Sequence, residues 1–254
     1  MDNNLIPDAI ALTDRTCRLT DRLLRKQRTD PADRTRVVML AHALRMLRFV
    51  QGAVTLARAG NLEPACVLTR TVLEMGWVML SIQADPTQMD EWLAQANGEA
   101  IKTIRRLKQL GEDERLPTLS DAHIDAAIAS LPAGKNFNLR YWAVASGAPQ
   151  AYPTIYQQLS ACAHAEMPAT GAYTRWDVAP GNPASVQDAD LEELPADSLN
   201  IATALLLDSL RYLAGPTLTA EELRELEGLE ELKRAQTARL DEIRMKHIQT
   251  PSDP

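Results

Sequence analysis

The amino-acid sequence predicts an all-α protein, a single bundle of about six to eight helices that ends in a long C-terminal helix. Apolar residues recur at the three- and four-residue spacing of helices along most of the 254 residues. Capping residues followed by proline, and single glycines, occur where helices would begin and end. No segment shows the alternation of apolar and polar residues that is typical of a half-buried strand.

The first expected helix covers residues 5–28 and is amphipathic. Beside its leucine-rich face, four arginines fall within about 80° of arc at the helical rotation per residue; they are Arg15, Arg18, Arg22 and Arg25. Such a stripe is either a solvated face that pairs with carboxylates elsewhere or a ridge that contacts the phosphates of RNA. The second interpretation predicts binding that weakens as salt is added.

The second expected helix begins at Asp30-Pro31, because aspartate is a good N-cap and proline suits the first helical position. It ends at Gly60, and Asn61 would cap the next helix, which includes residues 64–84. This third segment is almost wholly apolar, so we expect it at the centre of the bundle. The short link makes the two helices an antiparallel hairpin.

Arg70 and Glu74 interrupt the apolar segment one helical turn apart. An unpaired charge inside a core costs several kcal/mol, so both side chains are expected to be paired or hydrogen-bonded. Arginine before glutamate is the weaker order for an ion pair within one helix, which points to partners from another helix. The sequence therefore predicts a polar site inside the core.

The middle of the chain combines two more helices with an aromatic-rich region. Asp85-Pro86 repeats the capping signal and starts a fourth helix, and a shorter helix is expected at residues 121–130. Seven of the eleven aromatic residues lie within residues 137–176. Among them, Tyr156 and Trp142 are the candidate ligand-binding residues.

Residues 153–167 are expected to form one helix. A helix there places three polar side chains on one slowly drifting face: Tyr156, Ser160 and His164. Packed against the apolar segment, they would meet its two charges, and a carboxylate, an imidazole and a hydroxyl together can act as a general base and nucleophile beside an anion-stabilising guanidinium. The candidate catalytic residues are His164, Arg70, Glu74 and Ser160. A hydrogen-bonded network that fixes helix register explains the same residues, and the nucleophile elbow of serine hydrolases is absent.

Residues 168–197 are rich in Pro, Gly and Asp and are expected to form a long loop. A strongly apolar helix follows, capped by Asp197 or Ser198 and stopped by Gly215-Pro216.

The last helix opens with a capping box formed by Thr219 and Glu222. Its leucines hold no strict heptad, so we expect a long, partly exposed helix that lies against the bundle or a partner subunit. The chain therefore divides into a helical bundle, residues 1–216, and a C-terminal helix with a short tail, residues 217–254.

Charge is unevenly distributed. The net charge is −7, yet residues 15–58 contain eleven Arg or Lys against three Asp, about +8, which leaves about −15 for the remainder. This polarity fits RNA bound at the basic end, head-to-tail association into a homo-oligomer, or an acidic segment folded over the basic one. Protein partners are expected at the C-terminal helix.

Composition excludes several classes of protein. Three isolated cysteines without a CxxC pair argue against a disulfide framework or a zinc site, and no cofactor motif is present. We expect no metal and no cofactor. The first residues lack a basic and an apolar signal region, and charges interrupt each apolar run, so a cytoplasmic protein without a membrane partner is expected.

Two motifs, LARAGNLEPACVLTRTVLEMGW with its R-x3-E and YQQLSACAH with its Y-x3-S-x3-H, together resemble an uncharacterised bacterial family of all-helical proteins. The likeness covers about residues 51–164, and it implies a polar cluster without supplying an activity; the implied cluster consists of Arg70, Glu74, Ser160 and His164. More distantly, Arg36 and His42 have the R-x4–6-H spacing of HEPN-type domains from toxin–antitoxin and phage-defence systems. That similarity implies a metal-independent ribonuclease that uses Arg and His at a dimer interface.

Two functions follow as hypotheses. The first is an oligomeric binding or interaction protein whose polar cluster is structural or holds a small ligand. The second is a HEPN-like ribonuclease or toxin effector, with the arginine stripe as a guide for RNA. Among the histidines, His42 on its apolar helix is expected to be a satisfied core residue.

Overall fold

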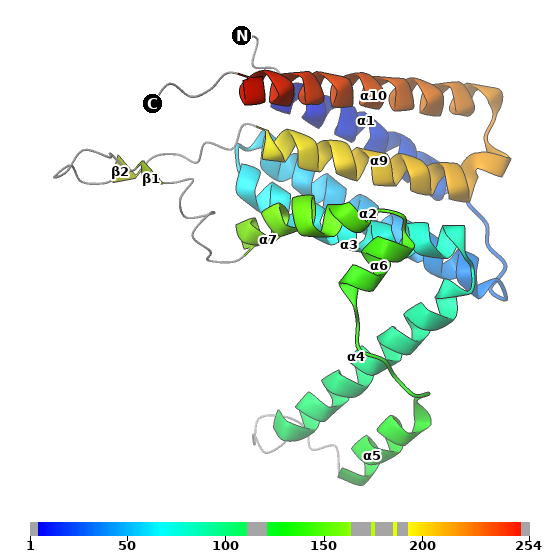
Figure 1. Ribbon diagram of the computed structural model, residues 1–254. Coiled ribbons are helices and arrows are strands. Elements are labelled where there is room, and N and C mark those ends of the chain that lie inside the picture. Colours follow the sequence, from blue (N-terminus) through cyan, green and yellow to red (C-terminus); the bar gives the residue numbers. More distant parts are fainter. Residues whose placement is uncertain (1–4, 111–120, 164–173, 176–184, 187–192, 250–254) are drawn as a thin grey trace.

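The computed structural model describes residues 5–110, 121–163, 174–175, 185–186 and 193–249. Within these residues the chain forms nine α-helices, one more than the upper end of the predicted range (Figure 1). They are α1 (Leu5–Leu24), α2 (Arg34–Arg58), α3 (Leu62–Ala84), α4 (Gln88–Leu110), α5 (Asp121–Ser130), α6 (Leu139–Ala145), α7 (Gln157–Ala163), α9 (Leu194–Ala214) and α10 (Ala220–Gln249). The prediction of an all-α protein is confirmed.

Shorter elements connect the helices. The 3-10 turns are η1 (Pro149–Ala151) and η3 (Gly215–Thr217), and η2 (Tyr152–Tyr156) is a π-helical turn that runs directly into α7. The one strand pair in the described residues is antiparallel and two residues long, β1 (Thr174–Arg175) with β2 (Ser185–Val186).

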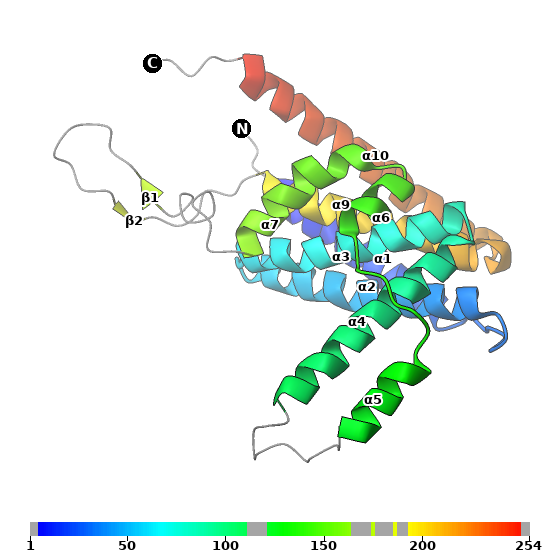
Figure 2. The same ribbon diagram turned by 60° about the horizontal axis from the view of Figure 1, so that its bottom comes forward.

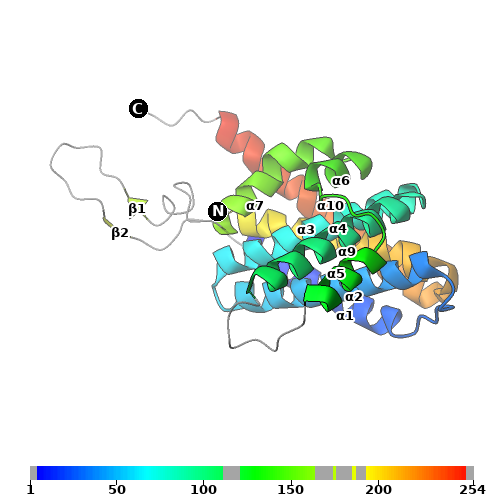
Figure 3. The same cartoon turned by 90° about the horizontal axis from the view of Figure 1, so that it is seen from below.

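Helices α1, α2, α3, α9 and α10 lie side by side and build the bundle (Figures 1 and 3). Helix α9 packs against each of the other four, and it is apolar on most of its surface, as a helix in the centre of a bundle must be. Leu47 of α2, Trp77 of α3 and Leu206 of α9 are fully buried in this core. The hairpin of α2 and α3 is confirmed, and Gly60 in its link has a φ of +78°, which glycine adopts without strain.

The predicted start of the second helix is wrong. The Asp30 carboxylate accepts a hydrogen bond from the backbone N–H of Ala32 at 2.8 Å and closes a turn instead. The helix begins at Arg34, where the carboxylate of Asp33 accepts from the backbone N–H of Arg36 at 2.9 Å. Two aspartates three residues apart both have capping chemistry, and the later one caps the helix.

The predicted start of the apolar helix near position 198 is also wrong, because α9 begins at Leu194. Proline suits the first turn of a helix, and Pro195 occupies that turn here. The Asp197 carboxylate is therefore free to form an ion pair with Arg244 of α10.

The C-terminal helix α10 lies along α1 and α9 and is drawn in red in Figure 1. Its capping box is confirmed: Thr219 donates its backbone N–H to Glu222 at 3.0 Å, and the Glu222 N–H is donated to the Thr219 hydroxyl at 3.2 Å. Leu226 and Leu229 are buried in the main core. Residues 217–249 thus pack on the same core as the rest of the bundle, and the division into two domains stays a prediction.

Helices α4 and α5 project from the bundle as an arm (Figure 2). The chain that returns from α5 lies against α4, where the Lys135 N–H donates to the carbonyl of Ala94 at 2.8 Å. Gly98 and Gly134 meet at this crossing, and a β-carbon on Gly98 would lie 1.9 Å from the Lys135 carbonyl oxygen. Two glycines at the contact allow the backbones to approach so closely.

Two helices, α2 and α3, are long and apolar enough to cross a membrane by length and composition alone. In the structure 39% of the apolar window of α2 and 67% of that of α3 are buried inside the protein. The core helices of a bundle have the same composition, so burial accounts for it. The absence of a membrane partner stays a prediction.

Candidate functional site

The polar cluster predicted for the core forms between α3 and the π turn η2. The phenol oxygen of Tyr156 accepts hydrogen bonds from Nε and Nη2 of Arg70, at 3.2 and 2.9 Å, and donates one to Oε1 of Glu74 at 3.0 Å. The Arg70 Nε also lies 3.2 Å from the same Glu74 oxygen. An ion pair within one helix therefore forms after all, and the partner from the second helix is a phenol.

Aromatic packing positions the Tyr156 ring. It stacks on Tyr152 with centroids 5.2 Å apart and an interplanar angle of 12°, and Trp77 of α3 lies 5.6 Å away. The guanidinium carbon of Arg70 is 5.1 Å from the ring centroid, within the range of a cation–π contact. The predicted single helix over residues 153–167 instead begins as a π turn, a feature often found at functional sites.

The cluster is half-buried, which corrects the expectation of a fully buried charge pair. The side chains of Arg70 and Glu74 are 24% and 28% exposed, while Tyr156 is buried. Burial raises the pKa of Tyr156, and the Glu74 charge adds to this rise, whereas the hydrogen bonds from Arg70 and the nearby Ser160 hydroxyl oppose it. The phenol therefore keeps its proton, which it donates to Glu74.

Ser160 lies one turn after Tyr156 and is buried. Its hydroxyl oxygen has no hydrogen-bond partner among the residues that the structure describes. The structure thus brings four of the predicted polar residues to one place: Arg70, Glu74, Tyr156 and Ser160. His164, the predicted catalytic histidine, lies outside the described residues, and its role stays a prediction.

Two thiols lie beside the cluster, Cys66 on α3 and Cys162 on α7. A hydrogen bond between them holds the pKa of Cys162 below its usual value and raises that of the buried Cys66. The third cysteine, Cys17, is isolated from them, and burial raises its pKa to about 12. Spacing along the chain gave no sign of the Cys66–Cys162 contact.

Trp142, predicted to bind a ligand, lies elsewhere in the fold. Its ring is fully buried, and its Nε1 donates to the Gln95 side chain of α4 at 2.9 Å. Its carbonyl accepts a hydrogen bond from Ser81, which is two turns, or about 10 Å, beyond Glu74 along α3. The indole packs where α3, α4 and α6 meet, and ligand binding by it stays a prediction.

The arginine stripe of α1 is largely paired. Arg18 forms an ion pair with Asp14 on α1, Arg25 just past the end of α1 pairs with Asp21, and Arg22 pairs with Glu225 of α10. Arg15 forms no ion pair within the described part of the chain and lines a groove. RNA binding by the stripe stays a prediction, and it would require these pairs to open.

Arg36 and His42, which carry the HEPN-type spacing, do not meet. The Arg36 guanidinium donates to the carbonyl of Leu213 at 2.8 Å. The half-buried ring of His42 bonds the Val38 carbonyl at 3.2 Å and packs edge-on against Trp92 at 5.2 Å. Burial lowers the pKa of His42, so this histidine is neutral near pH 7 and packs as a core residue.

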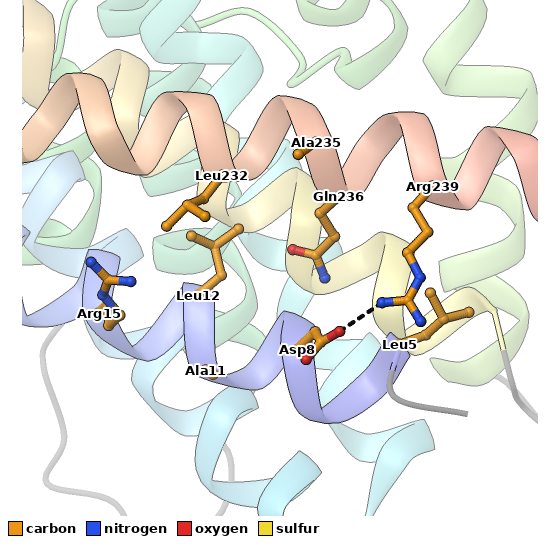
Figure 4. Close-up of a pocket in the computed structure, with 9 residues that line it drawn as sticks. All are labelled: Leu5, Asp8, Ala11, Leu12, Arg15, Leu232, Ala235, Gln236 and Arg239. Carbon is orange, nitrogen blue, oxygen red and sulfur yellow. Dashed lines mark hydrogen bonds and ion pairs between the residues drawn. The ribbon is translucent and has the colours of Figure 1, made fainter. Parts of the chain in front are cut away.

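A groove of about 320 Å³ separates α1 from α10. Figure 4 shows Leu12 and Leu232 pointing toward each other across it, and Gln236 reaching from α10 toward α1. An ion pair of 2.8 Å between Asp8 and Arg239 closes one end. The Gln236 amide nitrogen is buried and has no hydrogen-bond partner in the described part of the chain. Sequence patterns did not predict this groove.

Among the residues that the structure describes, no group of three or more His, Cys, Asp or Glu side chains could hold a metal ion.

Comparison with known proteins places the chain in a family. One family model matches residues 36–178, a region that runs from α2 past α7 and contains the Arg70–Glu74–Tyr156–Ser160 cluster. The resemblance expected over residues 51–164 falls within it. No curated protein and no solved structure matches the chain. Because the matched region covers more than half of the 254 residues, the protein belongs to DUF5677, a family of unknown function.

Proposed function

We propose that the protein is a self-associating helical binding protein, and that the Arg70–Glu74–Tyr156 cluster fixes the register of α3 against the π turn. The observation that supports a structural cluster is the bridging phenol, which bonds both charged side chains at 2.9–3.2 Å. A side chain that must act as base or nucleophile needs a free lone pair or an activated hydroxyl. Here the phenol uses its proton on Oε1 of Glu74 and accepts from two guanidinium nitrogens of Arg70, so its hydroxyl is engaged rather than activated.

The surface for self-association is the groove between α1 and α10, and its occupant is a second copy of this chain. Leu232 is 45% exposed at the groove, beside the exposed Glu231, while Arg15 stands unpaired within the described residues on the opposite wall. An exposed leucine between a negative and a positive side chain suits contact with a second copy of the same surface. A two-fold axis would bring Glu231 of each copy toward Arg15 of the other.

The oligomeric state tests this surface. We expect the wild type to run as a dimer or larger in size-exclusion chromatography with light scattering, and Leu232→Asp to shift it to monomer, because a buried unpaired carboxylate opposes association. Val144→Asp is the matched control, since Val144 is 57% exposed on α6, away from α10. A monomeric wild type, or a Leu232→Asp protein of unchanged size, would overturn self-association through this groove.

The structural role of the cluster has its own test. Tyr156→Phe removes one hydroxyl and leaves the ring, so we expect the free energy of unfolding to fall by about 1–3 kcal/mol through the lost bonds to charged partners. Tyr152→Phe is the control, because no hydrogen bond of its hydroxyl occurs within the described residues. Urea denaturation measures both. Equal stability of the two variants would contradict a structural clamp.

The Ser160 hydroxyl, which lacks a hydrogen-bond partner among the described residues, favours a second candidate, the metal-independent ribonuclease, because a polar group of a substrate can bind to it. Under our main proposal the purified wild type leaves single-stranded RNA intact without divalent cations, and its expression does not harm cells. Cleavage that disappears in His164→Ala would replace the main proposal with the ribonuclease.

A further inference from the structure

A second pocket, of about 480 Å³, lies on the other side of the π turn, between η2, α7, α9 and α10. Its volume is within the range of small-molecule sites. Ile155, Ile201 and Leu205 supply apolar wall. The polar groups come from three helices: Gln158 of α7, Asn200 of α9, and Lys233 and Thr237 of α10.

Asn200 is only 6% exposed, and its amide is held in one orientation. The Thr237 hydroxyl donates its single proton to the carbonyl of Lys233 at 3.0 Å, so it can only accept from Asn200. The Asn200 Nδ2 donates to it at 2.8 Å. The side-chain oxygen Oδ1 of Asn200 is then left buried, with no hydrogen-bond partner among the described residues. A buried acceptor without a donor is costly, so a ligand that supplies an O–H or N–H would be favoured here.

Lys233 brings a positive charge to the same pocket. Its ammonium forms no ion pair with any described residue, although it lies near Asp208 of α9. Burial raises the pKa of Asp208, and the Lys233 charge offsets this only in part, so Asp208 is a weakened counter-ion. The other charges on the lining, Arg244 and Asp197, neutralise each other in an ion pair. An anionic ligand would therefore supply the ion-pair partner that Lys233 lacks among the described residues.

We propose that this pocket binds a small hydroxylated anion. Its phosphate or carboxylate group pairs with Lys233, and its hydroxyl donates a hydrogen bond to the side-chain oxygen Oδ1 of Asn200. Lys233 precedes Thr237, the partner of Asn200, by one helical turn, so their Cα atoms are about 6 Å apart along α10. A three-carbon compound spans that distance. This site is separate from the groove and from the Tyr156 cluster, and the proposal goes beyond self-association.

Four probes separate the contributions of the two ends. Glycerol 3-phosphate and glycerate carry both groups, glycerol carries only hydroxyls, and inorganic phosphate carries only the anion. We expect at least one of the two hydroxylated anions to saturate with a dissociation constant of about 1 mM or tighter in isothermal titration, and each half-molecule to bind at least about tenfold more weakly. The side-chain amide signals of Asn200 should shift in NMR spectra of the full chain.

Variants locate the binding. Lys233→Met keeps the aliphatic stem of this half-exposed side chain. It should weaken binding of the anion at least about tenfold, a change of about 1.4 kcal/mol in binding free energy. Thr237→Val should also weaken binding of the anion, because the Asn200 amide loses the hydroxyl acceptor that orients it. Lys102→Met, on the distant α4, is the control. Failure of both hydroxylated anions to saturate below about 10 mM, or full affinity in Lys233→Met, overturns the proposal. Either result leaves the oligomeric-state test unaffected.

Discussion

Replacement of Trp142 by alanine is expected to lower the free energy of unfolding by about 3–5 kcal/mol, the cost of deleting a large, fully buried aromatic side chain. The indole fills the space where α3, α4 and α6 meet, so its loss leaves a cavity that three helices cannot easily close. The Gln95 side-chain oxygen also loses the indole N–H, although it keeps the backbone N–H of Asn138 at 3.1 Å. Chemical denaturation followed by circular dichroism measures the change.

Two further substitutions make this prediction specific. Tyr141→Ala removes a neighbouring ring that is exposed on the same helix, and we expect it to cost far less than the loss of Trp142. Trp142→Phe keeps most of the packing and deletes the N–H, so its cost should fall between the two. A Trp142→Ala protein as stable as the wild type would show that the indole has no packing role, and would favour its assignment to ligand binding.

Substitution of Gly98 by alanine is expected to detach the returning chain from α4, at a cost of about 3 kcal/mol, the upper part of the range for overpacking. The new methyl group would lie 1.9 Å from the backbone oxygen of Lys135 and 2.7 Å from its carbonyl carbon. A backbone cannot rotate away as a side chain can, so the segment itself must move. Hydrogen exchange of the Lys135 amide, which bonds Ala94, should accelerate strongly.

Gly228→Ala on α10 is the matched control for Gly98→Ala. No atom lies within 4 Å of the β-carbon that it would add, so the substitution only improves helix propensity. We expect it to stabilise the protein by up to about 1 kcal/mol, opposite in sign to the effect at Gly98. Unchanged exchange at Lys135 in Gly98→Ala would contradict the close approach of the two segments.

Within single helices the sequence was a reliable guide. The exceptions are two helix starts and the ion pair of Arg70 with Glu74, which the order of the two residues disfavoured. The hairpin of α2 and α3, the helix end near Gly60 and the capping box of Thr219 and Glu222 all follow from spacing and local chemistry. These features depend on neighbours three or four residues away, which the helical repeat already brings together. Periodicity also predicted that Tyr156 and Ser160 share a face toward α3.

Tertiary structure decided which side chains of one helix contact those of another. The phenol of Tyr156 bridges Arg70 and Glu74, whereas the sequence had made Tyr156 a candidate ligand-binding residue. Likewise the Gln95–Trp142 bond and the pocket of Asn200 and Lys233 depend on how far each helix is rotated and shifted against its neighbours. Helical repeats determine which residues share a face; the packing of a whole core determines which faces, and which atoms on them, come within hydrogen-bond distance.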